Sequence, residues 1–257
     1  SAPRAPGDPQ SIFASEAQLD LIARALVIDP YDFRMRNLVR DGDVSPLGHH
    51  WHNVMSARTM EAAAQAAGYH QPKPVIPGKK VGRGVALYER HIGAGTSVAK
   101  VVVAPDRTVT LYTALRDTGS GFYTVLRQII GQELGVPYNT VRMEAWTTDD
   151  TVFDTGVGGS RVTHVGGQAT YGAVQAVCQK LRELAAARYG WNPEEIIFKE
   201  EQMLVPGQPP VHLADLVAQS GGPVEAEFTY TAERDEHITA FCAQIAEVEV
   251  EEDTGEV

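Results

Sequence analysis

The sequence predicts an α+β fold in which mixed sheets pack against helices. Two kinds of segment alternate along the chain: in one, apolar residues recur at helical spacing, and in the other they alternate with polar residues as in strands. The chain has 257 residues, of which 43% are hydrophobic and 21% are charged. This is enough apolar material for a sizeable core in one large or two small domains.

Three helices are expected in the first seventy residues. Apolar spacing predicts the first over 11–27. The dipeptide Asp29-Pro30 predicts the start of the second, because Asp caps a helix and Pro suits its first position. A third is expected at about 54–67, ending at Gly68. The proline-rich stretch 69–80 then predicts a surface connector, so we divide the chain into a helical segment, 1–70, and an α+β portion, 71–257.

The α+β portion combines strands and helices. Period-two alternation predicts three early strands, which we expect to form an antiparallel meander, at about 81–92, 96–104 and 108–115. Later strands are expected near 141–145, 195–206, 224–231 and 241–251. Helices are expected at about 122–134, 161–188 and 212–218, and the second of these is the longest in the chain.

Composition excludes several classes of protein. The formal net charge is −11 and acidic residues crowd the C-terminal tail, which argues against a nucleic-acid or anionic-membrane partner. No apolar run approaches the roughly 18 residues of a membrane span and no signal region is present, so we predict a cytoplasmic protein. Cys178 and Cys242 alone provide neither a disulfide framework nor a cysteine-rich metal site, and we expect two buried thiols.

The segment from Asp154 to Thr163, before the longest predicted helix, carries the strongest indication of a ligand. Its glycines allow backbone amides to approach closely, and the hydroxyls of Ser160 and Thr163, the charge of Arg161 and the helix dipole favour an anion. The alternative is a strand-to-helix turn with a Ser or Thr cap. The tripeptide Gly119-Ser120-Gly121 precedes another predicted helix and either adds amides to the same ligand or forms an ordinary turn.

Two other patterns have simpler explanations than the catalytic or metal sites they resemble. The triplets Asp117-Thr118-Gly119 and Asp154-Thr155-Gly156 match that of aspartic proteases, in which two carboxylates from separate lobes share one proton. Here they stand only 37 positions apart, which is too close for each to belong to its own lobe. The cluster Gly48-His49-His50-Trp51-His52 cannot direct three adjacent imidazoles at one metal from regular structure, so we interpret it as a solvated loop.

Several segments, in order, resemble one enzyme family. They are Arg4-Ala-Pro-Gly7 with Pro9-Gln10, the helix pair ending in Arg34-x-x-Asn37-Leu38, Gly82-Arg83-Gly84, residues 117–121 with 128–137, residues 158–163 with Gly167-Gln168-Ala169, and residues 246–250 with Thr254-Gly255. Together they resemble the large, molybdenum-binding subunit of the xanthine dehydrogenase, aldehyde oxidase and carbon monoxide dehydrogenase family. The resemblance covers nearly the whole chain and implies a fold like part of a molybdopterin-binding domain.

The resemblance implies a molybdenum–molybdopterin cofactor, with the cytosine dinucleotide as one form. It places Arg4 near the molybdenum ligands and assigns cofactor contacts to the residues of the two glycine loops, which are Gly119, Ser120, Gly121, Gly159, Ser160, Arg161, Val162 and Thr163. This chain departs from the family at two positions. Ser120 stands where many members have Gln, and Pro6 stands where the purine and aldehyde enzymes often have an aromatic residue, which leaves the substrate open.

The function implied is part of an oxidoreductase that hydroxylates an aldehyde or N-heterocycle with oxygen from water. The family's upstream Phe-Gly loop and downstream Gly-x-Gly-Glu do not occur in the sequence, so we assign no catalytic residue and no metal ligand, and we expect the isolated chain to be inactive. Expected partners are the remaining molybdenum-binding segments and iron–sulfur and FAD subunits; alone, the chain should self-associate. The alternatives are a non-catalytic interaction or assembly module, and an α+β domain without a ligand.

Overall fold

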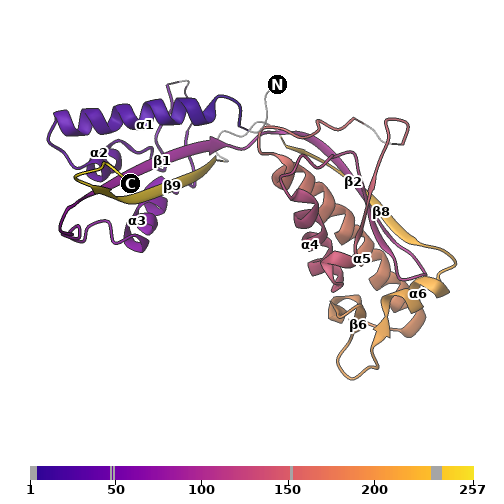
Figure 1. The fold of residues 1–257 in the computed structure, drawn as a ribbon. Helices are drawn as coiled ribbons and strands as arrows, with labels where there is room; N and C mark the ends of the chain where they lie inside the picture. The colour runs from indigo at the N-terminus through magenta and orange to yellow at the C-terminus, as the bar shows by residue number, and fades with distance from the viewer. Residues whose placement is uncertain (1–4, 47, 49, 151–152, 233–238) are drawn as a thin grey trace. The chain divides into compact units, whose positions relative to one another are not determined.

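The computed structural model describes residues 5–46, 48, 50–150, 153–232 and 239–257, and these form two compact units (Figure 1). Unit 1 comprises residues 1–92 and 236–257, and unit 2 comprises residues 93–235. Unit 1 combines two segments that are far apart in the sequence, because the last strand of the chain pairs with a strand near its beginning. The division into a helical segment, 1–70, and an α+β portion, 71–257, stays a prediction from the sequence.

The described residues of unit 1 form three helices and a two-stranded antiparallel sheet. The helices are α1 (Asp8–Ala25), α2 (Pro30–Asn37) and α3 (Ser56–Ala66), and the strands are β1 (Lys79–His91) and β9 (Thr239–Glu251). The predicted cap of α2 is confirmed, since the Asp29 carboxylate accepts the amides of Tyr31 and Asp32. A small core of Tyr31, Met60, Ala64, Tyr69 and Val85 joins α2 and α3 to β1.

A buried arginine connects three elements of unit 1. The Arg34 side chain, only 3% exposed, donates to the Glu16 and Asp20 carboxylates of α1 at 2.8 Å each. It also donates to the Glu16 and Pro30 carbonyls, while the Glu16 carboxylate accepts the amide of Leu87 in β1 at 3.1 Å. Every charge in this cluster is therefore paired, which is what keeps a buried arginine from destabilising the fold.

Unit 2 contains a four-stranded sheet with helices on one face (Figure 1). The strand order is β4 (Arg142–Ala145), β3 (Val109–Thr113), β2 (Gly95–Val103) and β8 (Val224–Ala232). Strand β2 is antiparallel to both neighbours, whereas β3 and β4 are parallel. The predicted three-stranded meander is wrong in its first strand, because β1 pairs with β9 and only β2 and β3 form the predicted hairpin.

Helices α4 (Phe122–Leu134) and α5 (Gly167–Tyr189) pack against each other, and α5 lies against β2 and β8. The core of this unit is mostly aliphatic, with Leu111, Leu126, Ile130, Val177 and Leu181 fully buried. The predicted helix over 161–188 differs at its start, where residues Val162–Gly166 form a π-helical turn, η2. Such turns occur often at functional sites.

The remaining elements of unit 2 lie beyond the C-terminal ends of α4 and α5. They are the 3₁₀ turns η1 (Tyr138–Thr140) and η3 (Pro193–Glu195), the strands β5 (Ile197–Lys199), β6 (Gln202–Leu204) and β7 (Val211–His212), and helix α6 (Leu213–Gln219). The three strands form a separate antiparallel sheet. No helix among the described residues is long and apolar enough to cross a membrane.

The two cysteines have different environments. Cys178 in α5 is buried as expected, and burial raises the pKa of its thiol to about 12. The expectation of a second buried thiol is wrong, because Cys242 is exposed. It lies on β9 between Phe241 and Ala243, whose side chains are half-buried, so it belongs to the opposite face of the strand.

Candidate functional site

The glycine-rich loop before α5 is attached to the start of β2. The Thr155 amide donates to the Thr96 carbonyl at 2.9 Å, and the Thr96 amide donates to the Thr155 hydroxyl at 2.8 Å. Further along, the Gly93 amide donates to the Gly159 carbonyl at 2.7 Å. The loop is therefore fixed at both ends to one short stretch of chain.

Two glycines outside the predicted site make this attachment possible. A Cβ atom on Gly93 would lie 2.8 Å from the Gly159 carbonyl oxygen, and one on Gly95 would lie 2.6 Å from the Thr155 hydroxyl oxygen. Gly95 also has φ +126°, which L side chains rarely adopt. The only sequence signal was a Gly-x-Gly at the start of a predicted strand, and it did not indicate which segment would approach.

The predicted turn ahead of the long helix is present. Gly159 and Ser160 have φ +57° and +59°, and the Arg161 amide donates to the Gly158 carbonyl at 3.2 Å. The chain then enters η2 and α5. Ser160 is a non-glycine residue in the left-handed region, which is uncommon and points to a constrained conformation.

The residues of this turn differ in exposure. Gly159, Ser160 and Thr163 are exposed, whereas the Val162 side chain is only 9% exposed and belongs to the core. Val162 can therefore offer a ligand its backbone but not its side chain. The Arg161 guanidinium is half-buried and donates to three carbonyls, those of Gly156, Ala94 and Thr155.

The second glycine turn precedes α4. Gly119 and Gly121 have φ +82° and +78°, and a Cβ on either would meet no atom within 4 Å. The Asp117 carboxylate accepts the Gly119 amide at 2.8 Å, and Gly121 caps α4 without a side-chain hydrogen bond. Ser120 is exposed between them. Open space therefore surrounds a helix start in this turn as well.

Packing places the two turns at the same end of the helix pair. A Cβ on Gly166 would lie 2.6 Å from the Leu115 side chain, and one on Gly167 would lie 3.5 Å from that of Ile129. Further along both helices, the side-chain amide of Gln175 donates to the Glu133 carboxylate. The helices thus run in the same direction, so the loops at their N-terminal ends share one end of unit 2. Arg4, the other predicted contact, lies outside the described residues.

The protease-like triplets have a structural role in this fold. The Asp154 carboxylate accepts the Gly156 amide at 2.6 Å and the Val98 amide at 3.3 Å. Asp117 likewise accepts the Gly119 amide. Both triplets are therefore turns in which an Asp side chain binds the backbone two residues ahead.

The His50 and His52 side chains lie in unit 1, outside the glycine-rich loops of unit 2. The rings of His50 and His52 stack with centroids 6.4 Å apart, while His49 lies outside the described residues. Among the described residues, no group of three or more His, Cys, Asp or Glu side chains is placed to hold a metal ion. His164 in η2 packs edge-on against Tyr230 of β8.

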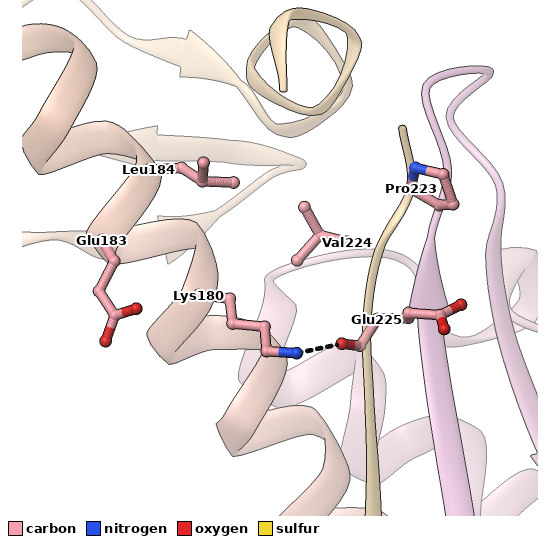
Figure 2. A pocket seen from close by; sticks show the side chains of 6 residues that line it. All are labelled: Lys180, Glu183, Leu184, Pro223, Val224 and Glu225. Carbon is pink, nitrogen blue, oxygen red and sulfur yellow. Dashed lines mark hydrogen bonds between the residues drawn. The ribbon is translucent and has the colours of Figure 1, made fainter. Parts of the chain in front are cut away.

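A surface cavity of about 410 Å³ lies between α5 and the start of β8 (Figure 2). There the Lys180 amine donates to the Glu225 carbonyl at 2.7 Å, beside Leu184 and Pro223. Lys180 follows Gly167 by thirteen positions of α5, about 20 Å along the helix axis. This cavity is therefore separate from the glycine loops.

Comparison with known proteins identifies the family. Two models described as molybdopterin cofactor-binding domains match residues 55–257 and 1–38. The chain belongs to this family. It is 30% identical, over its full length, to the molybdenum-binding subunit PaoC of an aldehyde oxidoreductase from Escherichia coli, and it spans 35% of that protein's length.

More distant relatives agree with this assignment. The chain is 24% identical over 78% of its length to the large chain of carbon monoxide dehydrogenase from Afipia carboxidovorans, of which it spans 28%. Its fold matches a solved carbon monoxide dehydrogenase from Oligotropha carboxidovorans with a TM-score of 0.76 at 22% identity, covering 95% of this chain and 35% of the other. An aldehyde oxidoreductase from Desulfovibrio gigas gives a TM-score of 0.66, with coverages of 96% and 27%.

Proposed function

We propose that the chain is part of a molybdenum-cofactor-dependent hydroxylase, in which it contributes a cradle for the cofactor and walls of the substrate channel. The reaction class is oxidative hydroxylation of an aldehyde or N-heterocycle with water as the oxygen source. The observation that carries the proposal is the presence of two glycine turns at one end of unit 2, each preceding a helix, in a chain that belongs to the molybdopterin-binding family.

The residues of these turns fit an anionic cofactor. The positions of Gly119 and Gly121 leave open space that a side chain would fill, so a ligand can approach the backbone there. Amides at helix starts and a serine hydroxyl in each turn are suitable donors to phosphate oxygens. We assign contacts with the pterin or its phosphates to Gly119, Ser120, Gly121, Gly159, Ser160, Val162 and Thr163, and we keep Arg4 as a proposed neighbour of the molybdenum.

When bound, the cofactor supplies the redox centre at which oxygen from water reaches the substrate carbon. This chain's residues bind and orient it, and none of them is assigned as a proton acceptor. The cytosine dinucleotide form of the cofactor, and electron transfer through iron–sulfur and FAD partners, are parts of the same proposal. The rest of the molybdenum-binding polypeptide would supply the missing catalytic groups.

Calorimetric titration of the chain with inorganic pyrophosphate tests the cradle without needing the rest of the enzyme. The wild type should bind pyrophosphate, and Gly159→Val should abolish binding, because a β-branched residue is strongly disfavoured at the φ of +57° found there. Ser160→Ala should weaken binding by about 1–2 kcal/mol, the value of one hydrogen bond to a charged group.

Gly222→Ala is a suitable control, since a Cβ there would meet no atom and φ is not positive. It should bind like the wild type. Absence of binding to the wild-type chain, or equal binding by Gly159→Val, would contradict the cradle. Either outcome would favour the alternative, a non-catalytic assembly module that keeps the fold without the cofactor.

A further inference from the structure

We propose that Arg161 is a positioning residue, which holds the glycine-rich loop in the shape that presents its amides and does not itself touch the anion. This proposal rests on the proposed function, in which the loop binds an anionic group of the cofactor. It differs from the family resemblance, which places Arg161 among the residues that contact the cofactor.

The guanidinium connects two separate segments of unit 2. Its Nε donates to the Gly156 carbonyl at 2.8 Å and one terminal nitrogen donates to the Thr155 carbonyl at 2.5 Å. The other terminal nitrogen donates to the Ala94 carbonyl, just before β2, at 3.3 Å. All three guanidinium nitrogens are thus engaged with carbonyls, and each carbonyl belongs to the backbone around the attachment of the loop to β2.

This arrangement orients the loop's peptide groups. In a trans peptide the carbonyl and the following N–H point in opposite directions. The Gly156 carbonyl points at the guanidinium, so the Val157 amide points away from it. The Gly159 carbonyl accepts the Gly93 amide, so the Ser160 amide points away from Gly93. Fixing these carbonyls therefore fixes the direction in which the amides face.

Only arginine suits this role. The planar guanidinium presents five donors in a fixed fork, which matches carbonyls that lie in different directions around it, whereas a lysine ammonium is a single point on a flexible stem. Arg161→Lys therefore keeps the charge but loses the simultaneous contacts. The two variants Arg161→Ala and Arg161→Lys separate the geometric effect from the electrostatic one.

The test combines amide hydrogen exchange with pyrophosphate titration of the full chain. The matched control is Arg188→Ala, at the other end of α5, because Arg188 is exposed and donates to the Gln219 side chain. In Arg161→Ala, exchange in residues 93–98 and 153–160 should accelerate at least about tenfold, the effect of losing one or more charged hydrogen bonds. Exchange in β3 and in the body of α5 should not change.

Pyrophosphate affinity should fall at least about tenfold in Arg161→Ala and by a similar factor in Arg161→Lys. Guanidinium ion at a few millimolar should restore both loop protection and affinity in Arg161→Ala, while leaving the wild type and Arg188→Ala unchanged. Unchanged loop protection in Arg161→Ala would overturn the proposal. If affinity nevertheless fell, Arg161 would be a direct ligand of the anion.

Failure of the proposed function gives a different result. If the wild type binds no pyrophosphate but Arg161→Ala still loosens residues 93–98 and 153–160, the cradle is wrong and the positioning role of Arg161 in the loop stands. If Arg161→Lys fully preserves loop protection and affinity, charge alone is sufficient and the positioning role is refuted.

Discussion

The close approach of Gly93 to Gly159 gives the most direct test of how the loop is held. We expect Gly93→Ala to displace the loop from the start of β2. An added Cβ would lie 2.8 Å from the Gly159 carbonyl oxygen and 3.3 Å from its carbonyl carbon. Both atoms are backbone, so neither can rotate aside as a side chain can.

The expected cost combines two effects. Relief of the contact requires a shift of a few tenths of an ångström between two backbone segments, and overpacking of this kind typically costs about 1–3 kcal/mol. The shift also lengthens the 2.7 Å hydrogen bond from the Gly93 amide to the Gly159 carbonyl, which contributes about 1 kcal/mol. We therefore expect a loss of about 2–4 kcal/mol in the free energy of unfolding, or an equivalent local opening of the loop.

Urea unfolding and hydrogen exchange of residues 93–98 and 153–160 measure these two outcomes. Gly222→Ala is the matched control, because a Cβ there meets no atom, and it should be neutral or stabilise the protein by less than about 1 kcal/mol. If Gly93→Ala matched this control in both measurements, the loop would not lie against Gly93 and the account of its attachment would be refuted.

Three further predictions concern the remainder of the fold. Arg34→Met should lower the free energy of unfolding of unit 1 by about 3 kcal/mol, because it leaves the Glu16 and Asp20 carboxylates without their partner. Urea unfolding measures this loss, and a change below about 1 kcal/mol would contradict the cluster's role. A thiol reagent at pH 8 should label Cys242 alone in the native chain, because the raised pKa of Cys178, about 12, keeps that thiol protonated well above pH 8, and rapid native labelling of both would show that α5 opens. The isolated chain should self-associate and bind apolar dyes through α1, where Phe13 and Leu21 are 77% and 58% exposed, and Phe13→Ser with Leu21→Ser should reduce both in sedimentation and dye assays; unchanged values would place the contact elsewhere.

Local patterns were sufficient to locate most elements in the sequence. The helix expected at 122–134 is α4, Phe122–Leu134, because its apolar residues recur at helical spacing and Gly135 stops it. The cap at Asp29 was also predictable, since an Asp-Pro pair carries its own mechanism. These signals act within one or two turns of chain and do not depend on the rest of the fold.

Long-range pairing was not predictable in the same way. Alternation marked both β1 and β9 as strands but carried no information that Val85 would face Ile245, so the meander was extended wrongly to β1. The sequence did not indicate where the loop would attach either, because Arg161 binds backbone carbonyls, which every residue has. The motif located the loop, but packing determined what its arginine does.

The charges around the two turns decide how an anion would be held. The Asp117 and Asp154 carboxylates lie within the turns, and the side chains of Arg116 and Arg161 carry two positive charges in the same segments. The starts of α4 and of η2 with α5 add about one more positive charge between them. The turns therefore favour an anion only weakly, in a chain whose net charge is −11. That net charge is screened beyond about 8 Å at physiological salt but only beyond about 30 Å at 10 mM salt, where it should repel pyrophosphate. Affinity must then come mainly from directed hydrogen bonds, so pyrophosphate binding should not weaken as salt is raised over this range. A steep fall with added salt would show that charge attraction, and not the shape of the backbone, holds the anion.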